Sequence, residues 1–129
     1  MQTPLLSNLD IVENIALIKE VHEGYSREAA HALAEEALEA FGYGHISRLR
    51  SVDCNDGERF IAQLLRATMT QYDKIVIVRP FVMLRDTVEM EVMGASVYRI
   101  AQSRECIVLD MRSNRSKYEA GGEMCHIIG

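Results

Sequence analysis

Apolar residues recur three and four positions apart in the first part of the chain, which is the spacing of one face of an α-helix. This pattern predicts a first helix over residues 7–24. Ser7 or Asn8 can cap its N-terminus, and Gly24 is suited to end it. The chain is therefore expected to begin with an amphipathic helix that buries one face.

Two more helices are expected before the helical spacing gives way to continuous apolar runs. Residues 26–42 begin with Ser26, a favourable N-cap, and end at Gly42. The apolar stripe expected on this second helix is Leu33, Ala37, Ala40 and Phe41. A third helix is expected over residues 57–70, with a denser apolar face. Its candidate N-caps are Asp53, Asn55 and Asp56.

Three apolar runs in the second half have the composition of buried strands: KIVIV, CIVLDM and MCHII. A helical pattern over residues 87–103 separates the first two runs, and a polar crossover separates the last two. Strands connected in this way form parallel sheets with right-handed crossovers. The sequence thus predicts an α/β fold in a single domain, residues 1–129. A helical layer over residues 1–70 would precede a small, mostly parallel sheet of about three strands with helical crossovers over residues 71–129.

The charge balance narrows the classes of partner. The chain carries 19 acidic and 14 basic residues, a formal net charge of -5 at pH 7. Nucleic-acid binding needs clustered Lys and Arg, so nucleic acid is not expected as a partner. No apolar run approaches the roughly 20 residues of a membrane span, and no secretory signal opens the sequence. We therefore expect a cytoplasmic protein that does not insert into the membrane.

The cysteines do not form a recognisable metal or disulfide pattern. Cys54, Cys106 and Cys125 are odd in number and lack CxxC spacing. Cys125 and His126 are neighbours in a predicted strand, where adjacent side chains point to opposite faces. We interpret the three cysteines as reduced core residues and expect no metal site.

Polar residues follow two of the predicted strands. Arg79 comes directly after the first strand, and Asp110 and Arg112 follow the second. Ligands of open parallel sheets bind beyond the carboxyl ends of the strands, so these residues are candidate contacts for an anion or for a partner's carboxylate. An ion pair between Arg79 and Asp110 would explain the same pattern without a ligand.

Four segments resemble, in order, the ATP-binding domains of ABC transporters. SNLDIVENIAL is similar to the run that leads into the helical subdomain of that family, and CNDGERFIAQLLRAT to its signature segment. KIVIVRPFVMLRD is similar to the Walker B strand with its D-loop, and CIVLDM to the strand that precedes the switch histidine. The matching positions are Gly57, Glu58, Arg59, Arg66, Ala67, Pro80, Phe81 and Leu84. The resemblance implies a helical-subdomain-like part followed by a partial P-loop NTPase-like core.

The residues on which ATP hydrolysis depends in that family are missing. The sequence contains no GxxxxGK[ST] phosphate-binding loop. Val78 and Arg79 stand where the family has its Mg²⁺-binding Asp and its catalytic Glu, and a guanidinium cannot act as a base. Asp110 or Met111 stands near the position of the switch histidine. The resemblance therefore implies a degenerate, N-terminally truncated ATPase domain without catalytic residues.

The loop that resembles the signature segment is a further candidate contact region. It consists of Asn55, Asp56, Gly57, Glu58 and Arg59. Asn55 and Asp56 replace the Ser and the first Gly of the family, and a carboxylate at Asp56 suits a helix N-terminus but repels a γ-phosphate. The loop is either a partner contact or only a capped helix start.

These observations favour a non-catalytic interaction or regulatory subunit that associates with itself or with a component of a transport system. One alternative is a nucleotide-binding ABC transporter subunit that completes an ATP site in trans. The other is a small anion-binding protein that uses the carboxyl edge of the sheet. No cofactor is expected in the chain alone, because ATP and Mg²⁺ would need a partner chain. A homo-oligomer or a hetero-subunit contact is expected, because the predicted sheet lacks the strands that cover it in the family.

Overall fold

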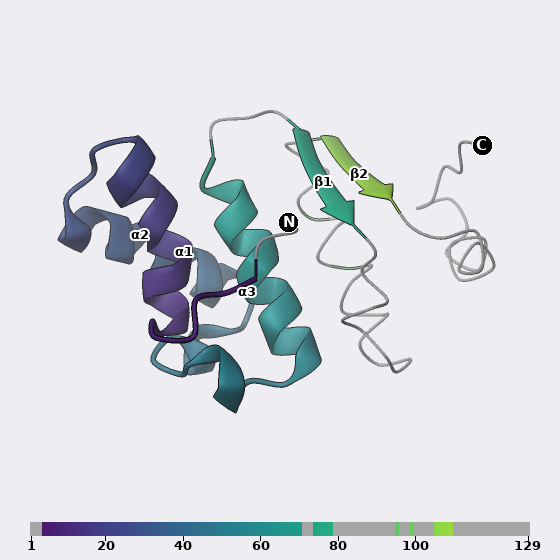
Figure 1. Ribbon diagram of the computed structural model, residues 1–129, viewed down its shortest axis with the longest axis horizontal. Helices are drawn as coiled ribbons and strands as arrows, with labels where there is room; N and C mark the ends of the chain where they lie inside the picture. Colours follow the sequence, from purple (N-terminus) through teal and green to yellow (C-terminus); the bar gives the residue numbers. More distant parts are fainter. Residues whose placement is uncertain (1–3, 71–73, 79–94, 96–98, 100–104, 110–129) are drawn as a thin grey trace.

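The computed structural model of the chain describes residues 4–70, 74–78, 95, 99 and 105–109. Its elements are α1 (Ile11–His22), α2 (Arg27–Ala40), η1 (Gly44–Ile46), η2 (Ser51–Asp53), α3 (Asp56–Thr68), β1 (Lys74–Val78) and β2 (Glu105–Leu109). The two η elements are short 3-10 helices in the connection from α2 to α3. Figure 1 shows α3 between the α1–α2 pair and the two strands. The described part of the chain is therefore mainly a three-helix body.

The predicted N-cap of α1 is wrong by two residues or more. Asp10, rather than Ser7 or Asn8, precedes the first helical residue. Its carboxylate accepts a hydrogen bond from the backbone N–H of Glu13 at 2.8 Å, and the Glu13 carboxylate accepts one from the N–H of Asp10 at 3.1 Å. This reciprocal capping box satisfies two N–H groups that otherwise have no partner in the helix.

The predicted boundaries of α2 are confirmed. The hydroxyl of Ser26 accepts a hydrogen bond from the N–H of Ala29 at 3.2 Å, as expected of an N-cap. After the last helical residue, Gly42 adopts a φ of 78°, a conformation that L side chains rarely take. Gly42 therefore lets the chain turn away from α2 without strain.

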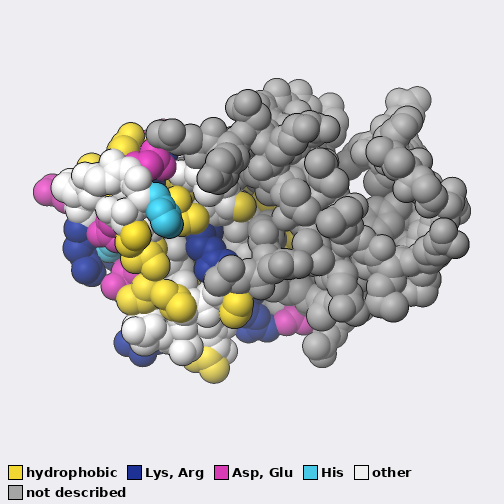
Figure 2. Space-filling model, turned by 45° about the horizontal axis from the view of Figure 1, so that its top comes forward, with side chains coloured by type: hydrophobic (Ala, Val, Ile, Leu, Met, Phe, Trp, Pro, Cys, Tyr) yellow, Lys and Arg dark blue, Asp and Glu magenta, His cyan; other side chains and the backbone are white. Residues whose placement is uncertain are grey.

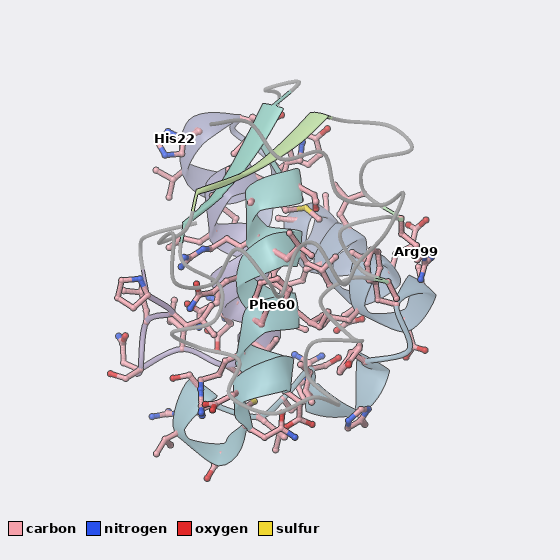
Figure 3. The ribbon with its side chains drawn as sticks, turned by 90° about the vertical axis from the view of Figure 1, so that its right-hand side faces the viewer. His22, Phe60 and Arg99 are labelled. Carbon is pink, nitrogen blue, oxygen red and sulfur yellow. The ribbon has the colours of Figure 1, made fainter. Side chains whose placement is uncertain are left out.

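The core is built by one face of α1, one face of α2 and the middle of α3, which is buried on all sides over residues 60–65. The buried apolar side chains of the helices are Ile11, Val12, Ile15 and Ala16 from α1, Ala30, Ala34 and Leu38 from α2, and Phe60, Ile61, Ala62, Leu64 and Leu65 from α3. Figure 3 shows Phe60 in the middle of α3. Each large apolar side chain that is buried contributes about 1.5–3 kcal/mol to stability. Of the predicted stripe of α2, Leu33, Ala37 and Phe41 are partly buried and pack against this core, whereas Ala40 is exposed.

A buried asparagine fastens the N-terminal segment to α1. Asn14 is 1% exposed, and its side-chain amide donates to the carbonyls of Leu6, Leu9 and Asp10 at 3.1, 3.3 and 3.0 Å. Its side-chain oxygen accepts a hydrogen bond from the N–H of Leu6 at 2.7 Å. A buried amide with this many partners fixes the path of residues 6–10.

The prediction of an α/β fold is wrong for the described residues. β1 and β2 pair in parallel, with Lys74 opposite Glu105 and Val78 opposite Leu109, but they form only a two-stranded sheet. The core residues for which burial is described lie in the helices and in the segments next to them. The helix expected over residues 87–103 is described only at Ala95 and Arg99, both helical, and the third expected strand lies outside the described residues.

We expect Asn14→Leu to lower the free energy of unfolding by about 2–4 kcal/mol, because it leaves the N–H and C=O of Leu6 without their partner. Chemical denaturation followed by circular dichroism measures this change. The matched control is Asn8→Ala, an exposed asparagine on the same segment, which should change stability by less than about 0.5 kcal/mol. Equal effects of the two substitutions would contradict this role for Asn14.

Candidate functional site

Only one of the two candidate regions from the sequence falls within the described residues. Asn55 is the N-cap of α3, and Asp56, Gly57, Glu58 and Arg59 form its first turn. We call these five residues the signature-like turn. The strand-end candidates Arg79, Asp110 and Arg112 lie outside the described residues.

The N-terminus of α3 is closed by side chains of its own first turn. The Asn55 side-chain oxygen accepts a hydrogen bond from the N–H of Glu58 at 2.8 Å. The Glu58 carboxylate accepts one in return from the N–H of Asn55 at 2.9 Å. Two of the backbone donors that a helix start can offer to an anion are therefore already used within the chain.

Arg59 joins this turn to the segment before it. Its guanidinium donates to the carbonyl of Ser51 at 3.0 Å and to the carbonyl of Cys54, and it forms an ion pair with Asp56. The Arg59 side chain is therefore held against the protein and is only 31% exposed. Spacing predicts the pair with Asp56, three residues away on a helix, but not the contact with η2.

Glu58 also connects the turn to η1. The second carboxylate oxygen of Glu58 lies 3.2 Å from Nε2 of His45. The His45 ring stacks on Tyr43, with 5.9 Å between ring centroids. Sequence patterns do not single out His45, because its partner Glu58 is 13 positions later and no helical or strand spacing relates the two residues. Its side chain is 64% exposed, so the pair contributes little to stability.

The thiol next to this turn is not an activated nucleophile. Burial raises the pKa of the Cys54 thiol, and the negative charge of Glu58 acts in the same direction. Cysteine reacts as the thiolate, and a raised pKa keeps Cys54 protonated near neutral pH. Its burial agrees with the core role expected from the sequence.

The signature-like turn is a capped helix N-terminus rather than an anion-binding site. A free helix N-terminus attracts anions through its N–H groups and its positive dipole end. Here the carboxylates of Asp56 and Glu58 occupy that end. In the described ranges, no three acidic, histidine or cysteine side chains are arranged to hold a metal ion.

Apolar side chains reach the surface of the helical body at a few places. Among the described residues, the large exposed ones are Leu6, Val21, Tyr25 and Val52. Val52, in η2, is 80% exposed, and it precedes the cap of α3 by three residues. Figure 2 shows apolar and charged side chains interspersed over one face of the helical body. None of the helices in the described ranges has the length and apolar content of a membrane span.

The fold has a counterpart among solved structures. The chain is similar to a metal-chelate type ABC transporter solved in an inward-facing conformation, with a TM-score of 0.69 and 14% sequence identity. The match covers 86% of this chain and 46% of the other, so this chain spans about half the length of its counterpart. At that identity the likeness concerns the fold alone. No family model matches the sequence, and no curated protein matches it.

We expect Glu58→Ala to destabilise the protein by about 0.5–2 kcal/mol, because it opens the capping box of α3. Glu58→Gln should retain most of the stability, since its side-chain carbonyl can still accept from the N–H of Asn55. Denaturation curves of the two variants, compared with the exposed control Glu36→Ala, measure the difference. If Glu58→Gln were as unstable as Glu58→Ala, the negative charge rather than the cap would be the stabilising feature.

Proposed function

We propose that this chain is a non-catalytic, ABC-ATPase-like interaction or regulatory subunit. Its partner is a second copy of the chain or a component of a transport system. The fold likeness to an ABC transporter structure supports the transport context. The order of the four sequence segments supports the ATPase-domain relationship, since the signature resemblance falls at the start of α3.

The main support for this proposal is that the N-terminus of α3 is already capped by side chains of its own first turn. In the ABC family the signature segment meets an ATP held by the opposite chain, so its helix start has to offer donors to phosphate. Here Asn55 and Glu58 use those donors for each other, and Asp56 adds a negative charge. An incoming γ-phosphate would have to break the capping box and approach two carboxylates. This arrangement favours a protein contact over a nucleotide contact.

The short helix η2, which precedes α3, exposes an apolar side chain, Val52, that can contact a partner. Val52 is the most exposed of the large apolar side chains described, and the exposed Arg50 lies on the same short segment. Protein interfaces combine an apolar centre with a polar rim, and Val52 with Arg50 offers both kinds of side chain. We therefore place the association surface at η2, beside the signature-like turn.

We expect no heat of binding when millimolar Mg-ATP is titrated into the purified protein, and no release of phosphate. The physical reason is the lack of a phosphate-binding loop in the sequence and the closed helix start of α3. Isothermal titration calorimetry and a phosphate-release assay measure these quantities. An ATP turnover that Asp56→Ala abolishes would refute the proposal and would favour the nucleotide-binding alternative.

We expect Val52→Asp to weaken self-association, or association with a transport component, by about tenfold or more, because it places a charge in a desolvated contact. Sedimentation velocity at several protein concentrations measures self-association, and co-purification with candidate components measures the other case. The matched control is Val21→Asp, an exposed valine in the last turn of α1, remote from η2. Equal effects of the two substitutions, or none from Val52→Asp, would contradict an association surface at η2.

A further inference from the structure

Three acidic side chains share the exposed face of α2. Glu28, Glu36 and Glu39 are all exposed, and together with the exposed Ala32 they recur three or four positions apart along the helix. Among the described residues, none of these three carboxylates forms an ion pair with a basic side chain. We call Glu28, Glu36 and Glu39 the acidic face of α2.

The position of these acids is unfavourable within the described part of the chain. Glu36 and Glu39 lie three positions apart on one helix, a spacing at which like charges repel. They also lie towards the C-terminus of α2, where the helix dipole is negative and the last turn contains no basic residue. Arg99 donates a hydrogen bond to the carbonyl of Ala40 at 2.7 Å, which satisfies the backbone rather than these carboxylates. A cation from another molecule would therefore reduce a repulsion between Glu36 and Glu39.

The connection from α2 to α3 presents the opposite charge. Arg48 and Arg50 are exposed there, and Val52, which is 80% exposed, follows them at the same two-residue spacing. In the described ranges Arg50 has no ion pair. The stem of an arginine is apolar and only its head is charged, so Arg50 can pack beside Val52 in a contact while it pairs with an acid. We call Arg48, Arg50 and Val52 the basic segment.

The acidic face and the basic segment adjoin each other on the same molecule. Nη2 of Arg48 lies 2.7 Å from Oε1 of Glu35, which belongs to α2. In a two-fold dimer the same patch of each copy meets its equivalent, so a self-complementary patch has to carry both halves of the contact. The described surface around Arg48 meets this condition, because it carries acids on α2 and cations on the basic segment.

We propose that the partner bound at η2 is a second copy of this chain. The basic segment of each copy lies on the acidic face of the other, so that Arg50 meets Glu36 twice in the dimer. This inference rests on the proposed function, because it names the partner of the association surface at η2. The chain carries a net charge of -5, so two copies attract each other only where cations of one meet acids of the other. An acidic region of a transport component is the competing occupant.

Charge reversal on each side of the contact tests this inference in the full chain. We expect Arg50→Glu and Glu36→Arg each to raise the Kd of self-association by about tenfold or more, because each places like charges together in both halves of the dimer. Sedimentation velocity at several protein concentrations measures the Kd. The control Glu20→Arg, a partly exposed acid on α1, makes the same change of charge and should leave the Kd unchanged.

An equimolar mixture of the two variants separates a specific contact from general destabilisation. In a mixed pair, the substituted position 50 of one chain meets the substituted position 36 of the other with opposite charge. The second half of that pair keeps the original Arg50 and Glu36. We therefore expect the mixture to associate with about the wild-type Kd, although neither variant does so alone.

The possible results distinguish this inference from the proposed function. A wild-type chain that stays monomeric up to about 100 μM would overturn the second copy as partner, and the proposed function would then require a transport component. Self-association that Val52→Asp weakens, but that the two reversals leave unchanged, would overturn the contact with α2 and keep the surface at η2. Failure of the mixture to restore association would also overturn the inference. If a reversal prevents folding, Arg50→Ala and Glu36→Ala test the same contact, and an unchanged Kd in both would overturn it.

Discussion

The packing of α3 into the core is the constraint on which the other described contacts depend. α3 is buried on all sides over residues 60–65, and this fixes where the first turn of the helix lies. From that turn Arg59 reaches the carbonyls of η2, and Glu58 reaches η1. The same connection binds the start of α1, because Leu49 and Ser47 accept hydrogen bonds from its first two N–H groups at 2.9 and 3.1 Å. The starts of two helices are thus held by one loop.

Local sequence signals predicted the parts of this arrangement that depend on local interactions. Ser26 and Asn55 were recognised as N-caps because a short polar side chain bonds to a backbone group only three residues away. The same rule applies to Asp10, yet Ser7 and Asn8 satisfied it equally well in the sequence. The N–H groups of Ile11 and Val12, which a helix capped at Ser7 or Asn8 would use internally, instead donate to the carbonyls of Leu49 and Ser47. That choice is made by a contact between segments, which spacing alone does not reveal.

The apolar face of α2 was predicted only in part, and the fold class was wrong, for a related reason. α2 is rich in alanine, so several faces of the helix are nearly equally apolar, and only packing against α1 selects Ala30, Ala34 and Leu38. A sheet depends even more on pairing between distant segments. A run of β-branched residues predicts a strand but not the number of partners it finds. In the candidate site, His45 and the contact of Arg59 with Ser51 were likewise inaccessible to local reasoning.

The N-terminus of α3 and the C-terminus of α2 are both bound by charged side chains, but these side chains come from different parts of the chain. At the start of α3 the acids belong to the helix itself, so exposing its N–H groups to a ligand means breaking the cap that stabilises the helix. At the end of α2 the cation is Arg99, 59 positions away from its partner Ala40 in sequence. Recruitment of an anion at α3 would therefore break a local cap, whereas the cap of α2 depends on a side chain from a distant part of the sequence.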